Sequence, residues 1–307
     1  MATHNSGAST NGVLGGTGGS NLLPKHVAAG VWQKAMEKSI VPGLAQNEPM
    51  ILGDNVFTIQ TKRPAASIVG EGENKPDSEI EYGAKVVRPI KAVVGLEFTL
   101  EAILSNPAGV LGALSGELSG ALARQVDLAV FHGVEASSGS TITGVEYLNE
   151  TTNRQALAES DPGVDLWAGY EQVVNGNNDF TGFAFDPRLV HKLAIARGND
   201  GRRIYPELNM GSALGGFAGL PAAVSKTVSG QADASSDTGV RGFGGDFSAL
   251  RFGYVVDIPV KRIEYGDPFG NGDLQRRNAV AYLAEVIFGW AILDLDAFVA
   301  YDDESAS

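Results

Sequence analysis

The residues of this 307-residue chain that could do chemistry are mostly carboxylates. Asp294 and Asp296 stand two positions apart in an apolar segment, so a strand would place both side chains on one face. Paired carboxylates can act as general acid and base, but a structural or solvated pair is the simpler interpretation. Asp267, Asn271 and Asp273 could offer oxygen ligands to a cation, yet their spacing differs from that of an EF-hand loop. We therefore favour a plain turn there.

Other kinds of catalytic or metal chemistry have little support. The chain has no cysteine, which excludes disulfides, thiolate nucleophiles and cysteine-based zinc sites. Its four histidines do not stand at a ligand spacing from one another; they are His4, His26, His132 and His191. No G-x-S-x-G elbow, P-loop or complete G-x-G-x-x-G occurs. We expect no catalytic residue, no metal and no cofactor, and a hydrolase with a lid ribbon is the enzymatic alternative that a turnover assay would test.

Composition narrows the classes of function further. The formal charge is −13, whereas a protein that binds nucleic acid by neutralising phosphates should be basic. Such a chain could still line a space that holds nucleic acid, because net repulsion keeps the contact non-adhesive. No apolar run approaches the roughly 20 residues of a membrane span, and the N-terminus does not read as a signal peptide. We expect a protein made in the cytoplasm, with no membrane partner.

Residues 106–133 predict one long helix around which the other elements are arranged. Asn106 is a good N-cap, Pro107 suits the first helical position, and Gly133 is a stop signal. Apolar residues between them recur every three or four positions and so share one face. Glycines at a spacing of four would leave a smooth strip for close packing; they are Gly112, Gly116 and Gly120.

Two predicted strands flank a long polar segment. Residues 55–61 and 85–98 are rich in β-branched and aromatic residues, and more than twenty polar, turn-rich residues lie between them. This length excludes a tight hairpin. We expect a long two-stranded ribbon, which is marginal in water by itself and should lie on a neighbouring subunit.

The rest of the chain mixes helices and strands without a regular βαβ alternation, which favours an α+β fold. Residues 1–21 are rich in Gly, Ser, Thr and Asn, and this composition predicts a flexible arm. Residues 22–46 predict a short helix broken before Pro42. The later elements are expected as helices at about 164–174 and 187–197, and strands at 183–185, 220–225, 254–263, 279–287 and 291–300.

Five motifs occur in the order found in one family. They are LARQVDLAVFHG from Leu122, FDPRLVHKLAIARGNDGRRIYP from Phe185, GFAGLPAAVSKTV from Gly216, FGGDFSALRFG from Phe243 and LDLDAFVAY from Leu293. Together with the order of arm, ribbon, long helix and late strands, they resemble the major capsid proteins of tailed bacteriophages with the HK97-type fold. The likeness covers about residues 22–301. It departs from the family pattern where Leu295 replaces the usual Pro, where an extra Gly follows Phe243, and where no basic residue precedes Gly289.

The resemblance implies a division of the chain into the parts of that fold. Its spine helix would be 106–133, and its extended loop, the E-loop, would be 53–98. The parts implied are an N-terminal arm at 1–21, a peripheral domain at 22–52, 99–136 and 254–288, and an axial domain at 137–253 and 289–307.

The function implied is that of a shell subunit. It would assemble as hexamers and pentamers into an icosahedral virion capsid around double-stranded DNA, in the host bacterial cytoplasm. Its partners would be other copies of itself, a portal protein and a scaffolding protein, with a decoration protein as a further candidate and with non-specific proximity to packaged DNA. An encapsulin-like nanocompartment that encloses a cargo enzyme is the alternative with the same fold.

The charged residues of the ribbon are candidates for contacts between subunits. They are Lys62, Arg63, Glu71, Glu73, Lys75, Asp77, Glu79, Glu81, Lys85 and Arg88. Some family members also crosslink a ribbon lysine to an asparagine of a neighbour. Lys75, Asn271 and Asn278 are the candidates here, but acidic residues around Lys75 favour its charged, non-nucleophilic form. We expect no crosslink.

Overall fold

The computed structural model describes residues 38–62, 64–105, 110–158, 161–198, 200–206, 208 and 214–303. For residues 110–113, 115 and 256–259 only the backbone is described. The expected arm at 1–21, the helix expected within 22–37 and the N-cap at Asn106 lie outside these ranges.

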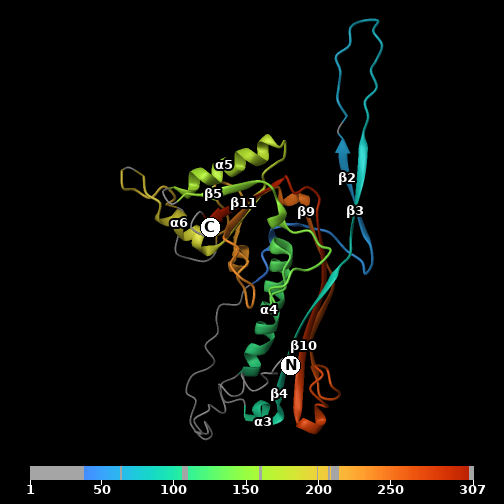
Figure 1. The fold of residues 1–307 in the computed structure, drawn as a ribbon, viewed down its shortest axis with the longest axis vertical. Helices are drawn as coiled ribbons and strands as arrows, with labels where there is room; N and C mark the ends of the chain where they lie inside the picture. The colour runs from blue at the N-terminus through green and yellow to red at the C-terminus, as the bar shows by residue number, and fades with distance from the viewer. Residues whose placement is uncertain are drawn as a thin grey trace. The chain divides into compact units, whose positions relative to one another are not determined.

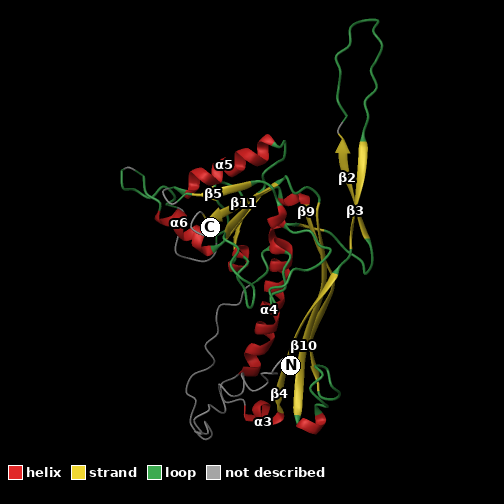
Figure 2. Cartoon of the chain, in the orientation of Figure 1, coloured by secondary structure: helices red, strands yellow, loops and turns green. Residues whose placement is uncertain are grey.

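The described chain forms two compact units (Figure 1). One contains residues 91–125 and 256–286, and the other contains 39–90, 126–255 and 287–303. The elements in chain order are α2 (Val41–Leu44), β1 (Gln46–Asn47), β2 (Asn55–Lys62), β3 (Glu81–Val87), β4 (Ile90–Thr99), α3 (Leu100–Ser105), α4 (Val110–His132), β5 (Arg154–Leu157), α5 (Pro162–Asn175), β6 (Gly182–Phe185), α6 (Pro187–Ile195), β7 (Ala222–Val224), β8 (Val240–Gly245), β9 (Leu250–Ile263), β10 (Ala279–Ile292) and β11 (Phe298–Asp303). The α+β class expected from the sequence is confirmed (Figure 2).

A five-stranded sheet is the centre of the second unit, with the order β5-β11-β8-β6-β7. Strand β11 pairs parallel with β5 and antiparallel with β8, and the helix α5 packs on β5 and β11. Tyr301 of β11 is fully buried beneath α5, where its hydroxyl donates to the backbone oxygen of Leu166 at 3.1 Å. Gly169 leaves the space for this ring, since a Cβ there would lie 2.5 Å from it. Burial raises the pKa of Tyr301, so its hydroxyl stays a donor.

The first unit contains part of α4 packed on strands. Leu114 and Leu118 of α4 form a buried cluster with Phe98 of β4 and Ala284 of β10. These leucines lie four residues apart, so the apolar face expected for the long helix is the face that packs. In the four-stranded sheet the strand order is β1-β9-β10-β4.

Several boundaries differ from the expectations. The strand expected at 85–98 is divided into β3 and β4 at Pro89, which has no N–H to donate to a ladder. The strands expected at 279–287 and 291–300 are wrong in extent, because β10 runs through Gly289 to Ile292 without a break. Residues 240–245 form the strand β8, which was not among the expected strands, and β9 begins at Leu250 rather than at 254. Pro42 lies in the first turn of the separate short helix α2, whereas the helix expected before it falls outside the described residues.

No helix of the described ranges is both long and apolar enough to span a bilayer.

Candidate assembly surfaces

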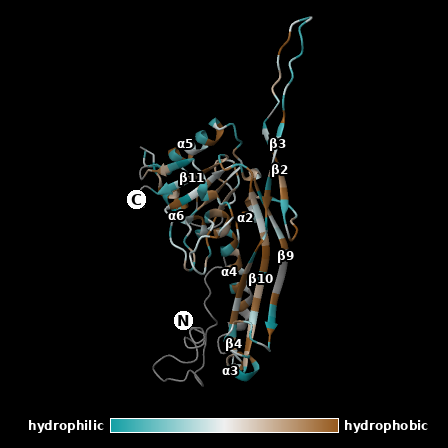
Figure 3. Ribbon diagram, turned by 45° about the vertical axis from the view of Figure 1, so that its right-hand side comes forward, coloured by the Kyte–Doolittle hydropathy of each residue, from teal (hydrophilic) through white to brown (hydrophobic). Residues whose placement is uncertain are grey.

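The two strands β2 and β3 form an antiparallel ribbon with its own sheet. Their register pairs Asn55 with Val87 and Ile59 with Gly83, and it ends at Lys62 opposite Glu81. Residues 64–80 continue as a loop beyond the strands, with every residue exposed (Figure 1). Figure 3 shows this loop as mainly hydrophilic or neutral, with a short hydrophobic stretch. Ile68 and Val69 are neighbouring aliphatic residues of this loop, and Ile68 is fully exposed.

Some of the charged ribbon residues have partners in their own chain. Lys62 Nζ lies 2.7 Å from Glu79 Oε2 and 3.8 Å from Glu81 Oε1. Arg88 at the end of β3 pairs with Asp54, and this hydrogen bond lowers the pKa of Asp54. These contacts fasten the two sides of the ribbon to each other.

The remaining loop charges are directed to solvent. Glu73 accepts from the backbone N–H of Gly70 at 2.9 Å, and Asp77 accepts from that of Ser78. Glu71 and Lys75 make no ion pair within the described ranges, and both are exposed. Arg63 lies outside the described residues. Whether these charges contact another subunit stays a prediction.

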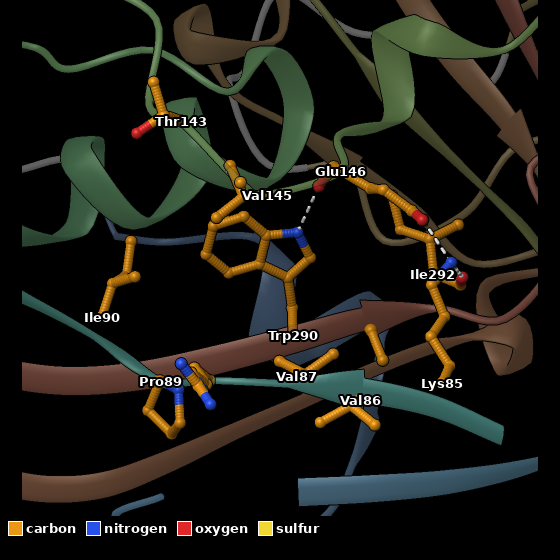
Figure 4. Close-up of a pocket in the computed structure, with 13 residues that line it drawn as sticks. Lys85, Val86, Val87, Pro89, Ile90, Thr143, Val145, Glu146, Trp290 and Ile292 are labelled. Carbon is orange, nitrogen blue, oxygen red and sulfur yellow. Dashed lines mark hydrogen bonds and ion pairs between the residues drawn. The ribbon is translucent and has the colours of Figure 1, made fainter. Parts of the chain in front are cut away.

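Lys85 has a different environment from the other ribbon charges. Its ammonium group donates to Glu146 and to the backbone oxygen of Ile292 (Figure 4). Trp290 completes the cluster, because its Nε1–H donates to the backbone oxygen of Glu146 at 2.7 Å. Lys85 therefore anchors the base of the ribbon inside its own subunit, a role that the sequence did not indicate.

An open pocket of about 420 Å³ lies beside this anchor. Its walls come from the ribbon base, from residues 143–146 and from the end of β10. Figure 4 shows the Trp290 indole lying between Val145 and the backbone near Val87. The pocket contains one lysine and one carboxylate that already pair with each other, so it offers no free acid–base pair.

Asp127 of α4 is a buried carboxylate surrounded by donors. It accepts from Ser39 Oγ at 2.6 Å, from the backbone N–H groups of Ile40 and Val41 at 3.1 and 3.4 Å, and from Thr227 Oγ1 at 3.0 Å. Burial nevertheless raises the pKa of Asp127 to about 7, and the bonds from Ser39 and Thr227 oppose this rise. This side chain fixes the start of α2 against α4. Its signal in the sequence is a lone acid within the apolar run 126–131.

His132, five residues further along α4, is kept neutral. Burial lowers its pKa to about 4, and its Nε2 lies 2.9 Å from the backbone oxygen of Val228. Because a carbonyl oxygen only accepts, Nε2 carries the proton and Nδ1 does not. The imidazole is a structural donor rather than a base that reaches solvent.

The other chemical candidates from the sequence form turns. Asp267 accepts from the backbone N–H groups of Gly272 and Asn271 at 2.9 and 2.8 Å, bonds that lower its pKa. The expectation that Asp294 and Asp296 share a strand face is wrong, because Asp294 Oδ1 accepts from the backbone N–H of Asp296 in a turn between strands. Within the described ranges no group of acidic, histidine or cysteine side chains could hold a metal ion.

The crosslink candidates lie on two separate segments. Lys75 is in the exposed ribbon loop, whereas Asn278 is an exposed residue with a left-handed backbone directly before β10. Asn271 is half-buried in the turn of Asp267. Lys75 and these asparagines stay candidates for a contact between copies.

Comparison with known proteins identifies the family. A model of the phage capsid family matches residues 19–303. The curated "Probable major capsid protein gp17" of Mycobacterium phage D29 is 24% identical over 290 residues, which are 91% of this chain and 89% of that protein. A solved structure of Gordonia phage Cozz contains a chain 54% identical to this one, with a TM-score of 0.83 and 94% of each chain covered. A chain of Mycobacterium phage Ogopogo is 34% identical, with a TM-score of 0.84 over 91% of this chain and 96% of that one. With its ribbon, long helix and α+β units, this chain belongs to the phage capsid family.

Proposed function

We propose that this chain is the major capsid subunit of a phage head and that it builds an icosahedral shell from hexamers and pentamers around double-stranded DNA. The family match over residues 19–303 and the name of the gp17 relatives support this proposal. These relatives favour a phage shell over a nanocompartment. They also favour a structural rather than a catalytic role.

The observation that carries the proposal is the exposed ribbon. An isolated two-stranded hairpin is marginal in water, and here residues 64–80 at its end are all exposed, including Ile68. Such a segment gains stability only by lying on another surface. In a closed ring each copy offers the same ribbon to the next copy, so one surface can satisfy every subunit.

The finer parts of the proposal follow from the resemblance to the capsid family. We assign the arm at 1–21, the peripheral domain at 22–52, 99–136 and 254–288, the extended loop at 53–98 and the axial domain at 137–253 and 289–307. The net charge of −13 would keep packaged DNA from adhering to the shell. Assembly in the host cytoplasm, with a portal and a scaffolding protein, belongs to the proposal too.

Electron microscopy tests the proposal directly. The chain would be expressed alone and with a candidate scaffolding protein, and negative-stain images should show closed particles of uniform diameter. Deleting residues 70–79 removes the loop end but keeps every ladder pair between β2 and β3, so the subunit should fold and form no closed shell. A variant with the same ten positions changed to Gly and Ser controls for loop length. Normal shells from the deletion would contradict the role of the ribbon, and monomers from the wild type in both preparations would contradict the shell function.

A further inference from the structure

Helix α5 has an apolar stripe that the described residues of its own subunit leave exposed. Leu166 and Val173 are buried against the sheet, but Val164, Trp167 and Val174 are 62%, 59% and 42% exposed. These three residues recur at spacings of three and seven, so they lie on one outward face of the helix. A tryptophan exposed in this way is a typical feature of a protein–protein contact.

A small apolar pocket lies beside the stripe. It has a volume of about 240 Å³, and aromatic side chains that include Trp167, Tyr170, Phe180 and Phe217 line it. That volume is several times the roughly 30 Å³ that one water occupies in the liquid. The pocket could therefore accept an aliphatic side chain from a partner.

The charge around this face has one sign. All the charged residues between 161 and 180 are acidic, namely Asp161, Asp165, Glu171 and Asp179. Asp161 and Asp165 accept from backbone N–H groups of Gly163 and Ala158. Glu171 and Asp179 are exposed, so they are available to a partner.

The turn after α6 has the complementary character. It is closed by a bridge between Arg197 and Arg203, and Ile195 and Ile204 flank it with 57% and 39% exposure. Arg202 has only a 3.8 Å contact with Asp200, with both side chains mostly exposed. The turn contains three arginines and one aspartate, so it is basic although the whole chain is strongly acidic.

We propose that the basic turn of one subunit, described at residues 195–198 and 200–204, docks on the α5 face of the next copy of this chain. Ile195 or Ile204 would enter the apolar pocket, while Arg202 and Arg203 would face Glu171 and Asp179. Both surfaces are exposed in the single subunit, so the chain does not cover one with the other. Because the two surfaces differ, the contact is head-to-tail, which is the kind of contact that the closed rings of the proposed shell require. This inference rests on the proposed shell function and assigns one of its subunit contacts.

Charge reversal tests the contact. Variant A carries Glu171→Arg and Asp179→Arg, and variant B carries Arg202→Glu and Arg203→Glu. Either variant alone places like charges opposite each other and should lower the yield of rings about tenfold or more. Two substitutions on exposed side chains of the other unit, Glu101→Arg and Arg276→Glu, serve as matched controls and should assemble like the wild type. Circular dichroism melts check that A and B remain folded.

Mixing A with B gives the decisive outcome. A and B attract each other at both surfaces, so they should form rings in which the two variants alternate. Alternation requires an even number of subunits, so native mass spectrometry should show six-membered rings with three copies of each variant and no five-membered rings. Normal rings from A or B alone, no recovery on mixing, or equal recovery of five-membered rings would each overturn the contact and leave the shell function intact. Failure of the wild type to form rings under the same conditions would instead contradict the shell function.

Discussion

The buried carboxylate of Asp127 makes the stability of the subunit depend on pH in a defined direction. Burial raises its pKa from 3.8 to about 7 in the folded state. Protons therefore bind more tightly to the folded state than to the unfolded state. The resulting stabilisation is fully present below about pH 4 and is lost as the pH rises toward 7.

The magnitude follows from the difference between the two pKa values. One pKa unit corresponds to about 1.4 kcal/mol, so the full loss between pH 4 and 8 is about 4 kcal/mol. Between pH 5.5 and 8, a range above the isoelectric point of about 4.7, the loss is about 2 kcal/mol.

Asp127→Asn isolates this effect because the amide has the same shape and no titratable proton. Its Oδ1 can still accept from Ser39 and Ile40, and the hydroxyl of Thr227 can accept from the new NH₂ group. Urea unfolding of unassembled wild type and variant should be measured at pH 5.5 and 8. All other titrations are common to both proteins, so the wild type should lose about 2 kcal/mol relative to the variant over this range.

Equal changes in the two proteins would refute the reasoning. That result would mean that the donors around Asp127 outweigh its desolvation and keep the carboxylate ionised in the folded state. Asp127→Leu provides a second comparison, since it leaves the backbone N–H groups of Ile40 and Val41 without an acceptor and should destabilise at both pH values.

Three further predictions concern single positions. Gly133→Ala should lower the unfolding free energy by about 3 kcal/mol in a urea titration, because Gly133 has a φ of +64° and a Cβ there would lie 2.3 Å from the Tyr147 ring. Gly144 has a φ of +78° but open space around it, so Gly144→Ala should lower the unfolding free energy by only about 1 kcal/mol in the same titration. Lys85→Met keeps the apolar stem but loses the hydrogen bonds to Glu146 and Ile292, so it should lower the unfolding free energy by about 1 kcal/mol. An unchanged unfolding free energy would contradict the anchor role of Lys85. Assembled particles boiled in detergent should give only monomer bands on a denaturing gel. A ladder of larger bands that disappears in the Lys75→Ala variant would instead show the crosslink.

Local signals in the sequence predicted much of the fold. The helix expected at about 187–197 is α6, which Asp186 caps and Pro187 begins, and the expected stop signal Gly133 follows the end of α4. The strand β6 covers the residues 183–185 that were expected as a strand, and it is fully buried. Such features depend on neighbours a few positions apart, which a sequence displays directly.

The partners of charged residues could not be predicted in this way. Lys62 pairs with Glu79 across a seventeen-residue separation, and Lys85 donates to Glu146 across sixty-one residues. These partners follow from ladder register and from packing between distant segments. In the same way, β10 continues through Gly289 because tertiary pairing overrides the low strand propensity of glycine.

The same charges decide what the ribbon can contribute to assembly. Lys62, Lys85 and Arg88 already have acidic partners in their own subunit, so Lys75 is the one described ribbon cation that makes no ion pair there. An exposed ion pair contributes about 0–1 kcal/mol, whereas full burial of an aliphatic side chain contributes about 1.5–3 kcal/mol. Ile68→Ser should therefore lower shell yield more than Lys75→Ala does, when both are compared by sedimentation of assembled particles. A larger loss from Lys75→Ala would mean that charge rather than apolar burial holds the ribbon on its neighbour.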